Sequence, residues 1–174
     1  MERFWRLAKT PIILLALVII LALAGKWGYE QVLAPVPEKV EPCVEQRLEN
    51  QTLNARSVTV RIRNASDFHG KASDVSQALK NKGFGVTGIG NADAKLEKTT
   101  IYGHAADDPE VKLVADNFKV KEIVGDGRID HSVEVHIGAD YPKDEGMNAD
   151  APNTIKTNSD TICLLPPPAE QAPN

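Results

Sequence analysis

The longest run of apolar residues in the chain is Pro11–Ala24, which contains no charged or polar side chain. Transfer of such a segment from water into lipid is favourable. The run is shorter than the about 20 residues of a typical membrane span, but apolar and aromatic residues on both sides extend it. We expect Trp5 and Trp27 at the two membrane interfaces. The pattern predicts a transmembrane anchor over residues 11–28, and the basic residues before it predict a cytoplasmic N-terminus at residues 1–10.

The alternative for this segment is a cleaved signal peptide. Ala22, Leu23 and Ala24 fit the small-x-small pattern that precedes a cleavage site. Both interpretations export the rest of the chain. With a retained anchor, the chain is a single-pass membrane protein whose C-terminal domain is extracytoplasmic.

Later in the chain, apolar and polar residues alternate in Val58–Arg63 and in Val133–Ile137, which is the period-two pattern of half-buried strands. Two other stretches repeat apolar residues every three or four positions, as one face of a helix does. Gly83 is expected to end the first of these helices. Asp108 as a cap, followed by Pro109, is expected to begin the second.

The predicted elements form a repeated pattern. In chain order they are a strand at 58–63, a helix at 70–82, a strand around 84–89, a strand at 99–102, a helix from Asp108 to about 118, a strand around 120–124 and a strand at 133–137. The predicted fold class is therefore α/β, in the form of an α+β sandwich, with one sheet of about five strands built from a repeated βαβ unit. Two helices cover one face, and the opposite face of the sheet is left for partners.

Three segments around this domain lack the regular pattern. Residues 29–56 contain several prolines among charged residues and then a weak helical signal, which predicts a linker and a wrapping segment. Residues 141–165 are predicted to be a loop that returns Cys163 to the domain, and residues 166–174 to be a disordered tail. The folded domain is thus expected at residues 57–140.

Cys43 and Cys163 are the only two cysteines of the chain. Both lie on the exported side, where disulfides persist, so we predict that they form a disulfide. Two free thiols would require a reducing compartment, which the apolar segment argues against. Ligation of a metal ion by two isolated cysteines is a still weaker alternative.

The charge of the chain argues against a polyanionic partner. The net charge is −4, and the basic residues around the apolar run make the exported part more acidic than this value. A negative field does not attract nucleic acid, so we predict no nucleic-acid partner.

Several patterns that resemble catalytic or metal motifs have simpler explanations. The glycines of Gly83–Gly88 satisfy GxGxxG, but they follow a helix and enter a strand, the reverse of a dinucleotide-binding turn. Ser66, Asp67 and His69 are neighbours in sequence, which rarely gives the geometry of a catalytic triad. His131 and His136 are five apart on a predicted strand and would face opposite sides. We therefore predict no enzyme, no cofactor and no metal site.

The loop that precedes the first predicted helix is the best remaining candidate for a binding site. It contains Asn64, Ser66 and Gly70. Backbone amides at a helix start can bind a carboxylate, phosphate or carbonyl oxygen. Capping of the helix is the simpler alternative.

Three stretches of the sequence resemble the LytR C-terminal domain family. They are VTVRIRNAS (58–66), HGKASDVSQALKNKGFGVTGIGN (69–91) and KTTIYG (98–103). Members share a strand ending in Asn and a small residue, a Gly-Ala helix ending in Gly-Phe, then Gly-Asn-Ala and a Thr-Thr strand. The positions in register are Asn64, Ala65, Ser66, Gly70, Ala72, Val75, Leu79, Gly83, Phe84, Val86, Gly90, Asn91, Ala92, Thr99, Thr100 and Tyr102. The resemblance covers about Ser57–Asp140.

Members of this family occur either behind a LytR-CpsA-Psr catalytic domain or alone behind one membrane anchor. The chain has no room for that catalytic domain, so it looks like the second kind, similar to the actinobacterial envelope integrity proteins. The resemblance implies a non-catalytic cell-envelope integrity or scaffolding protein whose extracytoplasmic domain binds envelope proteins or cell-wall polymers. The alternative is a module that binds peptidoglycan or another glycan directly. Stacking aromatic residues are common in such modules, and here aromatic residues make up only 5% of the chain.

Overall fold

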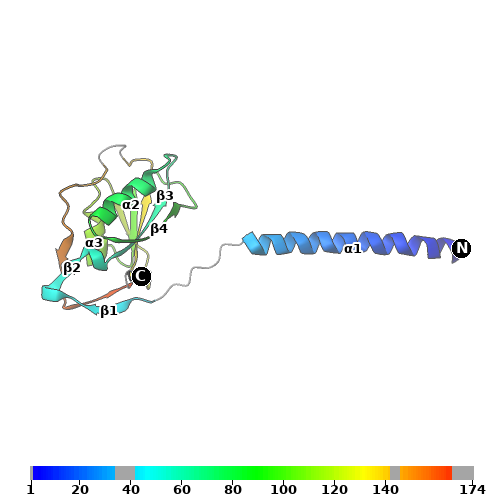
Figure 1. Ribbon diagram of the computed structural model, residues 1–174, viewed down its shortest axis with the longest axis horizontal. Coiled ribbons are helices and arrows are strands. Elements are labelled where there is room, and N and C mark those ends of the chain that lie inside the picture. The colour runs from blue at the N-terminus through cyan, green and yellow to red at the C-terminus, as the bar shows by residue number, and fades with distance from the viewer. Residues whose placement is uncertain (1, 34–41, 142–145, 166–174) are drawn as a thin grey trace, which may run out of the picture. The chain divides into compact units, whose positions relative to one another are not determined.

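The structure is a computed structural model that describes residues 2–33, 42–141 and 146–165 of the chain (Figure 1). It divides into two compact units, Met1–Lys39 and Val40–Asn174. The predicted disordered tail at 166–174 lies outside the described residues.

The first unit contains the helix α1, which runs from Glu2 to Leu33. The large apolar side chains described between Ile13 and Leu23 are all half or more exposed, and Trp27 is exposed as well. Within the described residues, none of the helices is both long enough and apolar enough to pass through a membrane. The predicted transmembrane anchor is therefore not confirmed.

The second unit is built on a five-stranded sheet with the strand order β4-β3-β7-β5-β6. The strands are β3 (Thr59–Asn64), β4 (Gly85–Asn91), β5 (Thr100–Gly103), β6 (Glu122–Gly125) and β7 (Val133–Ile137). β3 is parallel to both β4 and β7, β5 is parallel to β6, and β5 is antiparallel to β7. The prediction of one sheet of about five strands is confirmed.

Two helices connect the parallel strands of this sheet. α2 (Lys71–Asn81) joins β3 to β4, and α3 (Pro109–Ala115) joins β5 to β6. The two βαβ units run in opposite directions, so crossovers of the same hand place both helices on one face of the sheet (Figure 1). One buried core lies between them and the sheet. Its members include Val60, Ile62, Val75, Leu79, Ile101, Val111, Val114, Val133, Val135 and Ile137.

The end of α2 and the start of α3 lie where Gly83 and Asp108 predicted them. Gly83 has a φ of 97° and follows α2, as expected of a glycine that ends a helix. Asp108 stands at the N-cap position of α3 but does not cap it with its side chain. Its Oδ2 instead accepts a hydrogen bond from the amide of Ala105 at 2.9 Å, which closes the turn before the helix.

Four short strands replace the predicted wrapping segment and return loop. β1 (Val44–Arg47) pairs with β9 (Thr161–Leu164), and β2 (Thr52–Asn54) pairs with β8 (Thr154–Lys156), both antiparallel. Two 3-10 turns, η1 (Glu49–Gln51) and η2 (Ala55–Ser57), flank β2. Each strand has only three or four residues, too few for an alternating pattern to show. Their pairing joins residues 100 or more positions apart, which local sequence does not reveal.

The predicted disulfide between Cys43 and Cys163 is confirmed. The two Cα atoms are 5.3 Å apart, and the bond spans 120 positions of sequence. Cys163 lies in β9 opposite Glu45 of β1. The disulfide therefore fixes the β1–β9 pair at the point where the chain enters the domain.

Gly138 marks a close approach of two backbone segments at the end of β7. Its amide donates a hydrogen bond to Oγ1 of Thr99 at 3.2 Å, and this hydroxyl donates to Oδ1 of Asp140 at 2.8 Å. A Cβ at position 138 would stand 2.6 Å from the amide nitrogen of Thr99 and closer still to the carbonyl of Lys98. Only glycine fits there without a backbone shift.

We expect Gly138→Ala to lower the free energy of unfolding by about 1 to 3 kcal/mol, because the backbone of Lys98 and Thr99 has to move. Chemical denaturation of the full chain, followed by circular dichroism, measures this loss. Gly88→Ala is the matched control, because a Cβ at Gly88 meets only Cγ of Arg61 at 3.8 Å. Its expected effect is within about 0.5 kcal/mol. Equal effects of the two substitutions would contradict the close approach.

Candidate functional site

The face of the five-stranded sheet that α2 and α3 leave uncovered carries charged and aromatic side chains. Side chains alternate along a strand, so the residues between the buried valines and isoleucines of β3 and β7 point away from the core. In the strand register Arg61 lies opposite Glu134, and Arg63 lies opposite His136. Tyr102 of β5 lies opposite Glu134 on its other side. We call these five residues the polar face.

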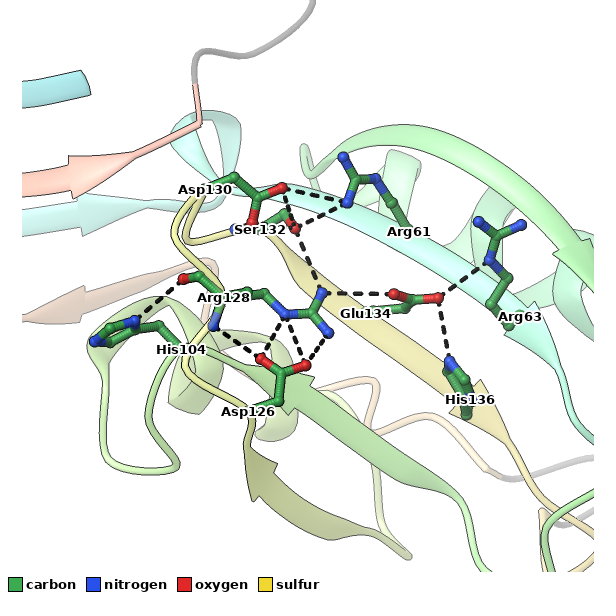
Figure 2. Close-up of polar contacts among 9 residues, drawn as sticks. All are labelled: Arg61, Arg63, His104, Asp126, Arg128, Asp130, Ser132, Glu134 and His136. Carbon is green, nitrogen blue, oxygen red and sulfur yellow. Dashed lines mark hydrogen bonds and ion pairs between the residues drawn. The ribbon is translucent and has the colours of Figure 1, made fainter. Parts of the chain in front are cut away.

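Glu134 is at the centre of the contacts on the polar face (Figure 2). Its Oε1 lies 3.1 Å from Nε2 of His136 and accepts a hydrogen bond from Nε of Arg63 at 3.1 Å. Its Oε2 lies 3.5 Å from Nη1 of Arg128. The hydrogen bond with His136, followed by that from Arg63, lowers the pKa of Glu134 from 4.5 to about 2, because each contact favours the carboxylate. Glu134 is therefore ionised at neutral pH.

The loop between β6 and β7 places a second group of charges beside the polar face. Arg128 donates from Nε to both carboxylate oxygens of Asp126, at 3.0 and 3.1 Å. This hydrogen bonding lowers the pKa of Asp126. Arg61 donates from Nη1 to Oδ2 of Asp130 at 3.3 Å and to Oγ of Ser132 at 3.2 Å. Asp130 is almost fully buried, so this pair is part of the structure and not a mobile surface contact.

Arg63 of β3 has room because the neighbouring strand β4 carries a glycine beside it. Gly90 lies beside Arg63 in the register. A Cβ at Gly90 would be 2.8 Å from Nη1 of Arg63, so the guanidinium lies directly over the strand. Gly90 thus lets the guanidinium of Arg63 extend sideways across the sheet.

A hollow of about 200 Å³ opens at one end of the polar face. It is lined by Arg63, Asn91, Ala92, Asp93, Glu134 and His136. The ring of Tyr102 is close by, because it makes an edge contact with the ring of His136 at 4.8 Å between centroids. The hollow thus presents guanidinium, carboxylate, amide and imidazole groups in fixed positions. Such a surface can bind a partner through directed hydrogen bonds.

The predicted helix-start loop is closed on itself by hydrogen bonds. Oδ1 of Asn64 accepts from the amide of Ser66 at 3.1 Å and from its hydroxyl at 2.8 Å, while Nδ2 of Asn64 donates to the carbonyl of Phe68 at 2.9 Å. Gly70 stands at the N-cap position of α2 with a φ of 84° and offers no side chain as a cap. The structure thus brings Asn64 and Ser66 together and gives their polar atoms partners within the loop.

Two of the histidines occupy different surroundings from those expected. His136 is in β7 and belongs to the polar face, whereas His131 precedes that strand and contacts α3 through Glu110. The expectation that the rings of His131 and His136 do not bind one metal ion together agrees with this arrangement. The reason is that His131 lies outside the strand, and not that the two alternate along it.

The alternation that predicted the core of β3 and β7 also contained the signal for the polar face. Arg61 and Arg63 occupy the outward positions of one strand, and Glu134 and His136 those of another. The strand order was needed to place these strands side by side. No periodic pattern indicated Arg128, which reaches the face from a loop.

Comparisons with known proteins give one family match and one solved structure. Residues 57–141 match the family model described as LytR cell envelope-related transcriptional attenuator. No curated protein matches the chain. The solved structure is the soluble domain of a conserved hypothetical secreted protein, an Rv2700 ortholog, from Mycobacterium marinum. It is 27% identical, and the match covers 64% of this chain and 78% of that one with a TM-score of 0.48.

Proposed function

Residues 57–141 form a domain of the LytR C-terminal family, which is related to the cell envelope, and from this premise we propose that the chain is a non-catalytic envelope integrity protein. In this proposal the domain is extracytoplasmic and acts as a scaffold that binds envelope proteins. The polar face is its binding surface.

The observation that carries the proposal is the one-sided cover of the sheet. Both helices pack on one face, and the other face presents arginine, glutamate, histidine and tyrosine side chains that hold one another in place. Groups that are already ordered lose little entropy when a partner binds them. The charges are also paired, so recognition depends on hydrogen-bond geometry more than on a net field. These properties suit a specific protein partner.

The proposal includes attachment to the membrane through α1. Its support is the run Pro11–Ala24, which has no polar side chain, and the exposure of the large apolar residues described along the helix. Burial of this surface in lipid would be favourable. The disulfide supports an exported domain, because disulfides persist outside the cytoplasm.

Photo-crosslinking in living cells tests the binding surface. A photoreactive phenylalanine analogue replaces Tyr102 on the polar face, and in a second full-length variant it replaces Lys80, which is exposed on α2. We expect a protein adduct from position 102 and none above background from position 80. Adducts of equal yield from both positions, or from position 80 alone, would overturn the assignment of the polar face.

The same cells test the anchor and the alternative function. After an alkaline carbonate wash, the full-length chain is expected to stay in the membrane pellet, and its release would contradict the anchor. Direct glycan binding is the alternative, favoured by Tyr102 beside the hollow that Arg63 and Asn91 help to line. A wall-polymer adduct from position 102, in place of a protein adduct, would support this alternative.

A further inference from the structure

A second cluster of polar side chains lies apart from the polar face, at the start of α3. It consists of Asp108, Glu110 and His131, each of which offers one atom within 4.8 Å of the atoms offered by the others. Nδ1 of His131 is 2.8 Å from Oε1 of Glu110 and 4.0 Å from Oδ2 of Asp108. Two carboxylates and one imidazole thus meet at a single point.

Glu110 is the feature of this cluster that needs an explanation. Its side chain is only 1% exposed, and its Oε2 has no hydrogen-bond partner among the described residues. Leaving a buried carboxylate oxygen without a partner costs about 1 to 3 kcal/mol or more. The oxygen belongs to the same carboxylate that faces His131. A cation that the Glu110 carboxylate ligates through both oxygens would supply the missing partner.

We propose that Asp108, Glu110 and His131 bind a divalent transition-metal ion. The donor set decides the class of ion, because an imidazole nitrogen favours zinc and its neighbours, whereas magnesium and calcium prefer oxygen ligands alone. Three protein ligands leave at least one coordination position for water. Two ligand atoms that each lie about 2 Å from a tetrahedral ion are about 3.3 Å apart. The 2.8 Å between His131 and Glu110 and the 4.0 Å between His131 and Asp108 lie on either side of this separation, so binding requires only small movements of the side chains.

The surroundings hold the ligands and give the ion a route of entry. The ring of His104 stacks on that of His131 with 4.3 Å between centroids, which fixes the plane of the imidazole. Asp108 is hydrogen-bonded to the amide of Ala105 and also lines a hollow of about 570 Å³ between the start of α3 and the β8–β9 segment. The side chains of His131 and Asp108 are 20% and 24% exposed, so an ion can reach these two ligands from solvent.

Isothermal titration of the purified full-length chain in detergent with Zn²⁺ tests the site. We expect one saturable site, and little or no binding of Mg²⁺ under the same conditions. Glu110→Gln, Asp108→Asn and His131→Asn should each weaken Zn²⁺ binding at least about tenfold. Asparagine is chosen at His131 because the residue has a φ of 52°, a conformation that asparagine tolerates.

Two controls separate this site from other ways of binding zinc. His69→Ala removes an exposed histidine of the helix-start loop and should leave the affinity unchanged. Thermal unfolding of each variant without metal shows whether it is folded, and Zn²⁺ should raise the unfolding temperature of the wild type but not of Glu110→Gln. Absence of saturable Zn²⁺ binding, or undiminished binding by all three ligand variants, would overturn the proposal.

Discussion

Replacing both Cys43 and Cys163 by alanine should lower the free energy of unfolding of the domain by about 2 to 5 kcal/mol. The disulfide spans 120 positions, so it closes nearly the whole domain into one loop and strongly restricts the unfolded chain. The chain-entropy model assigns a loop of this length roughly 4 to 5 kcal/mol. Chemical denaturation of the full-length wild type and double variant, at equal detergent concentration, measures the difference.

The location of the disulfide makes the prediction more specific. It lies beside the β1–β9 pair, a two-stranded sheet of four residues per strand that is separate from the main sheet. Without the bond, amide exchange should rise first in β1 and β9, while β3 and β7 at the centre of the main sheet keep their protection. Wild type treated with a reductant is the control and should behave like the double variant. A loss below about 1 kcal/mol, or no change in exchange at β1, would contradict this role.

The main fold could be predicted because its elements have strong local patterns. Val58–Arg63 and Val133–Ile137 alternate clearly, and α2 has an apolar stripe that ends at Gly83. These features depend only on neighbouring residues. The two strand-helix-strand units place both helices on one face of the sheet because the units run in opposite directions, which only the strand pairing shows. The parallel pairing of β3 with β7 is different, since it joins the first and last strands across both units.

The parts that could not be predicted depend on contacts between distant residues. β1 and β2 contain four and three residues and are held by β9 and β8, so their strand structure comes from pairing and not from a pattern of their own. Leu53 shows the same effect, because a lone leucine in a polar segment is fully buried in the core. Such short strands can therefore be identified only when the strands they pair with are known.

The candidate site follows the same division. The outward positions of β3 and β7 were visible in the sequence. The central position of Glu134 among Arg63, His136 and Arg128 required the structure. Arg128 reaches Glu134 from a loop that has no periodic pattern. The helix-start loop at Asn64, by contrast, was visible in the sequence, and its polar atoms have partners inside the loop.

We expect Glu134→Gln to lower the free energy of unfolding by about 2 to 3 kcal/mol at neutral pH. The pKa of Glu134 falls from 4.5 to about 2 in the folded protein, and its side chain is 20% exposed. A depressed pKa means that the ionised form is favoured by folding, and each pKa unit corresponds to about 1.4 kcal/mol. Glutamine keeps the size of the side chain but removes the charge that Arg63 and His136 contact.

The pH dependence of this loss distinguishes charge from shape. The contribution of Glu134 is fully present above pH 4.5, its ordinary pKa, and disappears as the pH falls towards about 2, its pKa in the folded protein. The difference between wild type and Glu134→Gln should therefore shrink over that window, while titratable groups that do not interact with Glu134 cancel. Glu122→Gln, an exposed residue of β6, is the matched control and should change stability by less than about 0.5 kcal/mol. A difference that stays constant from neutral pH down to about 2 would show that the substitution acts through packing, and the polar face would then not depend on the charge of Glu134.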